Sequence, residues 1–174
     1  TGLNKITQMP YSYPHFKFFI RDYFDQNIDR SLRILDVGPG AGTYSELIRH
    51  LGFKMDCLEI WEPYISRFNL TEKYDKVILN TIVDFDLSDY GYVIMGDILE
   101  HLTVDDSKKV LDQITTLGIK CLVAVPYQYE QGEYDGNPFE THLQPELTPT
   151  LVNERYPTLK LLVGDENYGY YVNN

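Results

Sequence analysis

The stretch RILDVGPGAGTYSELI, residues 33–48, decides the fold of this chain. An apolar run containing Asp36 leads into Gly38, Gly40 and Gly42, and a helical pattern of apolar residues begins directly after them. Glycines permit a tight turn and let a ligand approach the backbone with no Cβ in the way. A helix that follows such a turn presents free N–H groups at its start. The stretch therefore predicts a buried strand, a ligand-binding turn and a helix.

Strand and helix patterns alternate along the rest of the chain. Apolar runs typical of buried strands lie at residues 53–60, 76–79, 90–96 and 120–126, and the closing stretch 159–172 has two apolar runs around a turn signal, as in a hairpin. This alternation predicts one α/β domain over residues 1–174, with a Rossmann-like doubly wound sheet, mostly parallel, and helices on both faces. Ligands of such sheets bind beyond the carboxyl ends of the strands, where the glycine turn lies.

Four segments have the apolar spacing or the capping signals of helices. They are residues 14–28, the residues after the glycine turn, residues 63–68 and a segment capped by Thr103. Residues 1–30 are interpreted as an N-terminal helix or lid, with Phe16, Phe19 and Phe24 in the core and Tyr11, Tyr13 and His15 toward a ligand. The helix after Thr103 is expected to bury Val110, Leu111, Ile114 and Leu117.

The composition excludes several classes of function. The net charge of -11 argues against a nucleic-acid partner, because phosphate binding requires clustered Lys and Arg. No run of 18 apolar residues is present, so we expect no membrane span and no membrane partner. Cys57 and Cys121 each lie in an apolar run, which favours two buried, reduced thiols in a cytoplasmic protein.

The residues around the glycine turn narrow the class of ligand. A P-loop would need Lys followed by Ser or Thr, and no Lys lies in this stretch. A dinucleotide fingerprint would have glycine where this chain has Thr43. The carboxylate of Asp36 suits a ligand that carries an ammonium and a sulfonium group. Glu59, at the end of the second strand, is placed to accept hydrogen bonds from both hydroxyls of a ribose.

With these residues in place, the chain resembles the class I S-adenosylmethionine-dependent methyltransferases. ILDVGPGAGTYS is similar to the first motif of that family, CLEIWEPYI to the second and YGYVIMGDILEHL to the fourth. The resemblance implies about seven strands with the last one antiparallel, and S-adenosyl-L-methionine as the cofactor. The residues that it implies around the methionine moiety are Asp36, Gly38, Gly40, Gly42 and Gly96.

The resemblance also assigns the nucleoside end of the cofactor and the side that faces the substrate. Glu59 would bind the ribose, and Ile60 would lie against the adenine. Many relatives have an acidic residue after the third strand for the adenine amino group, and this chain has Asn80 and Thr81 there instead. Asp97 would face the substrate.

The segment 127–149 is the candidate substrate loop. Its stretch GNPFETH is similar to one in methyltransferases found with glycan-biosynthesis genes, which implies a small-molecule acceptor, such as a sugar or glycan precursor. Asp97, His101 and His142 are the candidate catalytic residues, as general bases toward an acceptor hydroxyl. The aromatic residues of the segment either stack on the acceptor or pack the loop: Tyr127, Tyr129, Tyr134 and Phe139.

Asp97, Glu100, His101 and His142 also resemble the metal-binding set of methyltransferases that modify the 3′ end of small RNAs. Two carboxylates and two imidazoles suit a divalent cation. We expect no metal, however, because Glu100 and His101 are neighbours next to a helix and should splay apart. The corresponding prediction is methyl transfer that resists chelators and depends on a single histidine.

Two other functions remain open. A nicotinamide-dependent oxidoreductase would use a similar turn, although Asp36 and Thr43 disfavour it. A catalytically silent methyltransferase-like domain that binds a partner would keep the cofactor pocket and lack an ordered acceptor cleft.

Overall fold

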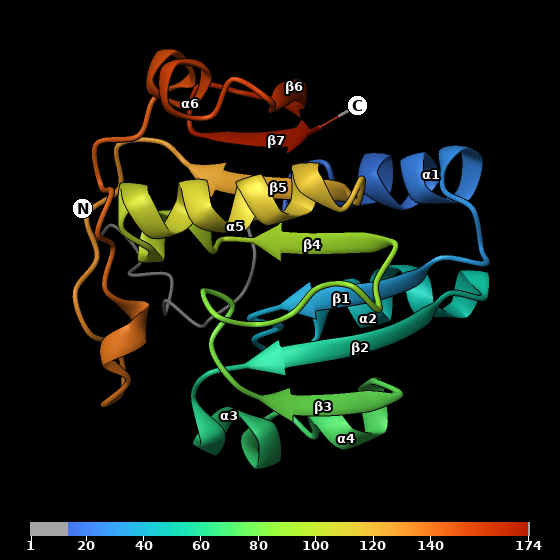
Figure 1. Ribbon diagram of the computed structural model, residues 1–174. Helices are drawn as coiled ribbons and strands as arrows, with labels where there is room; N and C mark the ends of the chain where they lie inside the picture. The colour runs from blue at the N-terminus through green and yellow to red at the C-terminus, as the bar shows by residue number, and fades with distance from the viewer. Residues whose placement is uncertain (1–13, 174) are drawn as a thin grey trace, which may run out of the picture.

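The computed structural model describes residues 14–173. Its centre is a seven-stranded sheet in the order β3-β2-β1-β4-β5-β7-β6 (Figure 1). β7 is antiparallel to both of its neighbours, and the other strand pairs are parallel. The predicted doubly wound sheet with an antiparallel last strand is therefore confirmed. The strands are β1 Arg33–Val37, β2 Lys54–Glu59, β3 Lys76–Leu79, β4 Tyr92–Gly96, β5 Lys120–Pro126, β6 Lys160–Gly164 and β7 Tyr168–Val172.

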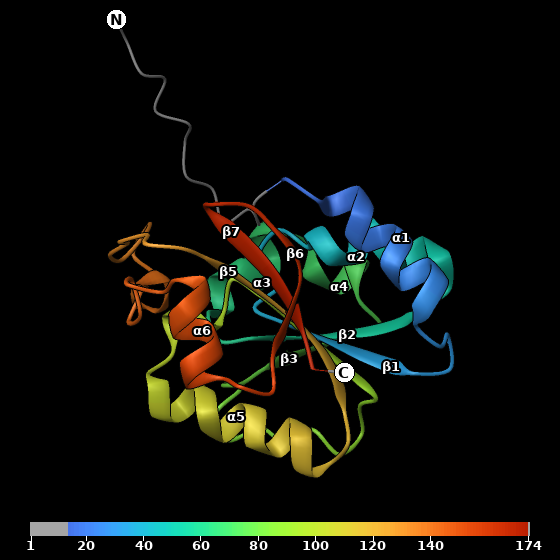
Figure 2. The ribbon, with the colours of Figure 1, turned by 90° about the horizontal axis from the view of Figure 1, so that it is seen from above.

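Helices cover both faces of the sheet, as predicted (Figure 2). α1, α2 and α4 pack on one face, and α5 and α6 pack on the other. The helices are α1 Lys17–Asn27, α2 Thr43–Ile48, α3 Glu62–Arg67, α4 Leu70–Lys73, α5 Val104–Thr116 and α6 Pro149–Arg155, and short 3₁₀ turns are η1 Arg49–Leu51, η2 Leu99–His101 and η3 Pro138–Glu140. None of the described helices has the length and apolar character needed to cross a membrane.

The central strands are apolar throughout because both of their faces are covered. In β4, Val93 and Met95 join the core under α5, while Tyr92 and Ile94 join the core under α1 and α2. The same alternation places the two cysteines in the two cores, and both thiols are buried and free.

The structure differs from the sequence-based prediction at several helical positions. Leu117 and Phe19 were expected in the core, but they are 45% and 46% exposed. Leu117 follows the last turn of α5, where the helix no longer faces the sheet. α6 was not predicted, although the chain has its start signals. The Thr148 side chain accepts a hydrogen bond from the backbone N–H of Leu151, and Pro149 opens the helix.

The topology places one site. From β1 the sheet grows in one direction through β2 and β3, and the chain then crosses back to add β4 on the other side of β1. The strand order therefore reverses between β1 and β4. In open α/β sheets, ligands bind outside the carboxyl ends of the strands at such a switch point. The glycine turn after β1, Glu59 at the end of β2 and Asp97 after β4 all lie at this edge.

Candidate active site

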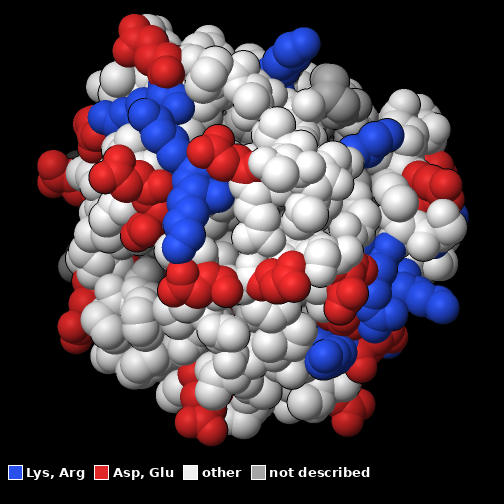
Figure 3. All heavy atoms as spheres, viewed as in Figure 1, with Lys and Arg blue, Asp and Glu red and all other residues white. Residues whose placement is uncertain are grey.

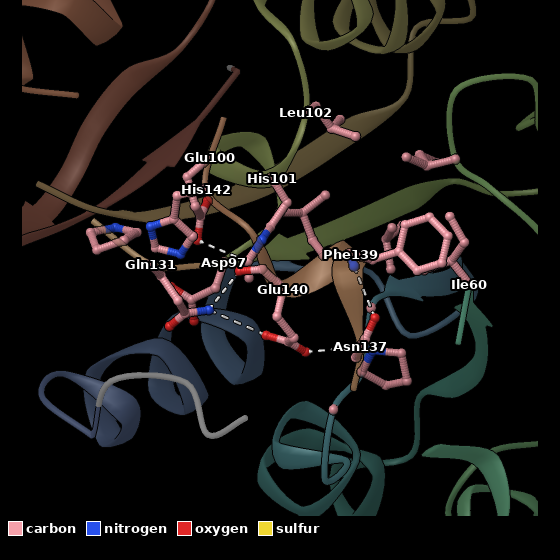
Figure 4. Close-up of a pocket in the computed structure, with 18 of the residues that line it drawn as sticks. Ile60, Asp97, Glu100, His101, Leu102, Gln131, Asn137, Phe139, Glu140 and His142 are labelled. Carbon is pink, nitrogen blue, oxygen red and sulfur yellow. Dashed lines mark hydrogen bonds and ion pairs between the residues drawn. The ribbon is translucent and has the colours of Figure 1, made fainter. Parts of the chain in front are cut away.

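A cavity of about 610 Å³ opens at this edge of the sheet. Its walls come from the β1–α2 turn, the ends of β2 and β4, the segment through η2, and the chain after β5 up to His142 (Figure 4). This volume is in the range of small-molecule sites. The predicted residues that line it are Gly38, Gly40, Glu59, Ile60, Asn80, Thr81, Gly96, Asp97, His101 and His142.

The glycine turn forms one wall. Gly38 and Gly40 have φ angles of +60° and +52°, a conformation that residues with a Cβ rarely adopt. The N–H of Gly38 donates to the carbonyl of Leu58 at 2.8 Å, which ties the turn to the end of β2. A Cβ on Gly38 would lie 2.3 Å from Cδ1 of Ile98, so a larger residue would also have to displace the end of that side chain.

Two residues predicted to contact the cofactor do not line the cavity. Asp36 is buried inside the sheet, and its carboxylate accepts a hydrogen bond of 2.5 Å from the Tyr74 hydroxyl. The position of a Cβ on Gly42 faces the side chain of Lys73 rather than the cavity. The prediction of direct contact for Asp36 and Gly42 is therefore corrected. They shape the turn from behind.

Glu59 and its neighbours form the next wall. Glu59 is 4% exposed, and its Oε1 accepts a hydrogen bond of 2.8 Å from the backbone N–H of Trp61. Burial raises the pKa of Glu59 to about 7, although hydrogen bonds from the N–H groups of Trp61 and Ile60 oppose this. Asn80 and Thr81 follow β3, and the Asn80 side chain accepts a hydrogen bond from the N–H of Thr81.

Asp97, which directly follows β4, also lines the cavity. Its φ of +59° is uncommon for a residue other than glycine, and such strain concentrates at functional sites. Its N–H donates to the carbonyl of Ala124 at 2.9 Å, and its carboxylate accepts a hydrogen bond of 2.7 Å from the Tyr168 hydroxyl. The antiparallel strand β7 thus helps to orient a predicted catalytic residue.

Lys17 is a charged residue near the site that the sequence analysis missed. Its Nζ donates to the Tyr170 hydroxyl at 2.8 Å. Burial lowers the pKa of Lys17 to about 8, and the charges of Asp97 and Asp36 oppose this. No local motif marks Lys17, because α1 reaches these partners only through the fold.

The GNPFETH stretch forms the far wall, and its residues have separate roles. The Asn137 side chain accepts the N–H of Phe139 at 3.0 Å and caps η3. Glu140 accepts a hydrogen bond of 3.1 Å from the Tyr64 hydroxyl, and its backbone carbonyl accepts one of 2.7 Å from the Gln131 amide. Burial raises the pKa of Glu140, and the hydrogen bond from Tyr64 opposes this.

The four aromatic residues expected in this segment all line the cavity. Tyr127 is buried, and its hydroxyl lies 2.6 Å from that of Tyr171, so it also packs the core. Phe139 is 46% exposed and meets Trp61 edge to face at 6.2 Å between ring centroids. Tyr129 lies beside His142, with 5.5 Å between ring centroids. Tyr127 thus matches the packing alternative, whereas Phe139 and Tyr129 keep surface available to a ligand.

Glu100, His101 and His142 converge at this end of the cavity (Figure 4). One ligand atom of each lies within 4.8 Å of the others, and Nε2 of His101 is 3.8 Å from Oε1 of Glu100. The expectation that Glu100 and His101 splay apart is therefore wrong. η2 is a 3₁₀ turn that ends before α5 begins, so α5 does not set the directions of these two side chains.

Gln144 holds this end together and was also missed. It is 1% exposed, and its amide donates to the carbonyls of Leu99 at 2.8 Å and Leu102 at 3.0 Å. Its carbonyl accepts hydrogen bonds from the Tyr156 hydroxyl at 2.6 Å and from Arg155 at 3.1 Å. Gln144 thus joins the turn that carries Glu100 to α6.

The cavity is lined by acidic residues and not by Lys or Arg of the described chain. Its lining residues include no Lys or Arg among the described part of the chain, but they include the carboxyl groups of Glu59, Asp97, Glu100 and Glu140. On the face shown in Figure 3, Lys and Arg lie beside Asp and Glu, and no continuous basic band crosses it. The site therefore suits cationic or neutral ligands.

Of the three residues that were expected to face a ligand from the predicted lid, Tyr11 and Tyr13 lie outside the described residues. His15 is described, and its Nδ1 lies 3.2 Å from the carboxylate of Asp165, in the turn between β6 and β7.

No protein-family model and no curated protein matches this chain. Solved structures do. The CcbJ methyltransferase from Streptomyces caelestis has a TM-score of 0.67 at 14% identity, over 91% of this chain and 89% of that chain. The PH0226 protein from Pyrococcus horikoshii OT3 has a TM-score of 0.66 at 14% identity, over 91% and 88%.

A third structure shows a neighbour with its ligands. The 1,6-didemethyltoxoflavin-N1-methyltransferase of Burkholderia thailandensis was solved with 1,6-didemethyltoxoflavin and S-adenosylhomocysteine. It has a TM-score of 0.62 at 14% identity, over 91% of this chain and 77% of that chain. The chain described here has the Rossmann-like fold of these methyltransferases.

Proposed function

We propose that this chain transfers a methyl group from S-adenosylmethionine to a small-molecule acceptor. The observation that carries this proposal is the cavity itself, whose lining brings the glycine turn and buried Glu59 together with Asp97, His101 and His142. Neighbours of the same fold, such as the Burkholderia thailandensis enzyme, were solved with S-adenosylhomocysteine in place.

The residues near the glycine turn and Glu59 fit this cofactor. Oε1 of Glu59 is held by the N–H of Trp61, so the carboxylate is fixed in position to accept ribose hydroxyls. Ile60 offers an apolar surface beside Asn80, whose side chain can hydrogen-bond an adenine. The carboxyl groups of the cavity, and the absence of Lys and Arg from its described lining, favour a cofactor with a sulfonium and an ammonium over an anionic one. When bound, the cofactor supplies an activated methyl group.

The residues at the other end of the cavity, toward His101 and His142, would orient the acceptor and take its proton. Asp97, His101 and His142 are the proposed proton acceptors, and burial lowers the pKa of His101 to about 4, so its imidazole is neutral at pH 7. Holding the acceptor in line would supply much of the rate, since orientation is worth about 7–11 kcal/mol. The exposed aromatic surface supports a sugar or aminosugar acceptor, on whose ring it can stack. The cavity has carboxyl groups and no basic residue in its described lining, which supports an acceptor that lacks phosphate.

Calorimetry tests the cofactor. S-adenosylhomocysteine should bind, and NAD and ATP should not. Glu59→Ala should weaken binding by about 1–3 kcal/mol, because a hydrogen bond to a charged group is lost, while the exposed Glu62→Ala serves as the matched control. Preference for NAD would favour an oxidoreductase instead.

A second experiment tests catalysis. Labelled S-adenosylmethionine is offered with neutral sugars, aminosugars, sugar phosphates and fractionated metabolites. His142→Ala should reduce methyl transfer and leave S-adenosylhomocysteine affinity nearly unchanged. Cofactor binding with no methylated product in any fraction would support the silent-domain alternative.

A further inference from the structure

We propose that Glu100, His101 and His142 bind one divalent transition-metal ion at the acceptor end of the cavity. Ion binding is argued from the geometry alone. Only the catalytic role of the ion rests on the proposed function.

The first argument is the state of Glu100. Its side chain is 1% exposed, and neither carboxylate oxygen has a hydrogen-bond partner among the described residues. An isolated buried carboxylate is costly, and proteins normally pair such a group or use it to coordinate a metal. The backbone around it is fixed, because its own carbonyl accepts the N–H groups of Leu143 at 2.7 Å and Gln144 at 3.1 Å.

The second argument is the orientation of the imidazoles. Nδ1 of His101 lies 3.3 Å from the carbonyl of Thr141, and Nδ1 of His142 lies 2.7 Å from the carbonyl of Tyr129. Each ring therefore donates its Nδ1–H to the backbone, which leaves Nε2 with its lone pair. Metal-binding histidines characteristically use the second ring nitrogen in this way, and the hydrogen bond fixes both tautomer and ring direction.

The third argument is distance. The candidate ligand atoms lie within 4.8 Å of one another, and the two imidazole centroids are 4.7 Å apart. Three atoms within 4.8 Å of one another lie at most about 2.8 Å from a common point, and metal–ligand bonds are about 2.1 Å long. Side-chain movements of about 0.7 Å would therefore close the set. Asp97 is not part of it, and the Tyr168 hydroxyl already contacts its carboxylate.

The donor set selects the kind of ion. Two imidazoles and one carboxylate suit Zn²⁺, Mn²⁺, Fe²⁺ or Co²⁺, whereas Mg²⁺ and Ca²⁺ prefer oxygen ligands. Three protein ligands leave positions open toward the cavity. An ion there would lower the pKa of an acceptor hydroxyl and favour acceptors with two adjacent oxygens, such as a vicinal diol.

With their Nε2 atoms on the ion, His101 and His142 hold the metal and leave Asp97 as the proton acceptor. The acceptor hydroxyl then gives its proton to the carboxylate of Asp97, and its oxygen forms a bond to the methyl carbon. The carbon–sulfur bond breaks, and its electron pair stays on sulfur as a neutral thioether. The proposed ion therefore predicts methyl transfer that a chelator inhibits, opposite to the expectation from the sequence.

Co²⁺ binding to chelator-treated protein tests the site directly. Visible absorption should show one bound Co²⁺ per chain, displaced by Zn²⁺ but not by Mg²⁺. Glu100→Gln and His142→Gln should each weaken Co²⁺ affinity by more than about 100-fold, the upper range for loss of a supporting partner. His50→Gln, an exposed histidine on η1, is the matched control and should bind Co²⁺ normally.

S-adenosylhomocysteine affinity, measured on the same variants, shows that they are folded and keeps the two proposals separate. If Glu100→Gln does not fold, the half-buried His142 gives the decisive variant. Absence of Co²⁺ binding, or equal binding in His142→Gln, would overturn the metal site even if the cofactor binds. Co²⁺ binding without S-adenosylhomocysteine binding would support the site and contradict the methyltransferase.

Discussion

At the scale of single residues, the buried carboxyl group of Asp36 makes the stability of the fold depend on pH. Burial raises its pKa from 3.8 to about 7, and the Tyr74 hydroxyl and the charge of Lys17 oppose this. Between these values the folded chain keeps a proton that the unfolded chain has lost, so stability falls as the pH rises through this window. Asp36→Asn removes the effect. We therefore compare the free energy of unfolding of Asp36→Asn with that of the wild type, by urea unfolding of the ligand-free protein. The difference in favour of the variant should be up to about 4 kcal/mol larger at pH 8 than at pH 4.

Tyr74→Phe is the opposite control. It removes the hydroxyl that holds the Asp36 pKa down, so the loss of stability between pH 4 and pH 8 should become steeper. Identical pH dependence in wild type and Asp36→Asn would show that Asp36 is not the source.

At the scale of elements, Gln144, two residues after the GNPFETH segment, links η2 to α6. Gln144→Ala leaves the carbonyl of Leu102 and the Tyr156 hydroxyl without a side-chain partner among the described residues, while the Leu99 carbonyl keeps the N–H of Leu102 at 3.1 Å. We expect a loss of about 3 kcal/mol in chemical denaturation, because unsatisfied buried groups cost about 1–3 kcal/mol each and the site partly relaxes. Because η2 is then no longer held in place, the rate of methyl transfer should also fall by a larger factor than the affinity for S-adenosylhomocysteine.

Tyr156→Phe provides the graded comparison. It removes one hydrogen bond and keeps the Gln144 amide in place, so it should cost about 1 kcal/mol and change turnover little. Equal effects of both substitutions on turnover would mean that α6, rather than the amide, positions η2.

At the scale of the whole molecule, the net charge of -11 and the acidic lining of the cavity both attract cationic ligands. S-adenosylmethionine has one more positive charge than S-adenosylhomocysteine. Raising the salt from about 0.01 M to about 1 M shortens the Debye length from about 30 Å to about 3 Å. Calorimetry should therefore show S-adenosylmethionine losing several-fold more affinity than S-adenosylhomocysteine.

Sinefungin, which has an amine in place of the sulfonium, is the charge-matched control and should follow S-adenosylmethionine. If all three ligands respond equally to salt, the carboxylates of the cavity are protonated or screened when the ligand binds.

The sequence by itself determined the sheet and the part of the cavity formed by the glycine turn and Glu59. The stretch after β1, the alternation of strands with helices and the closing hairpin are local signals, because backbone preference and apolar period depend on neighbours in the chain. Glu59 was found in the same way, since the end of a parallel strand is a fixed place in this fold.

Only the tertiary structure decided how the other end of the cavity is built, where Glu100, His101 and His142 converge. Glu100 and His142 lie 42 positions apart in the chain, and their meeting depends on where η2 and the GNPFETH segment pack. Asp36 was assigned to the ligand because a motif gives a position but not the direction of a side chain within a sheet. Lys17 and Gln144 had no local signal at all, since a buried polar residue is defined by its partners, and these come together only when the chain is folded.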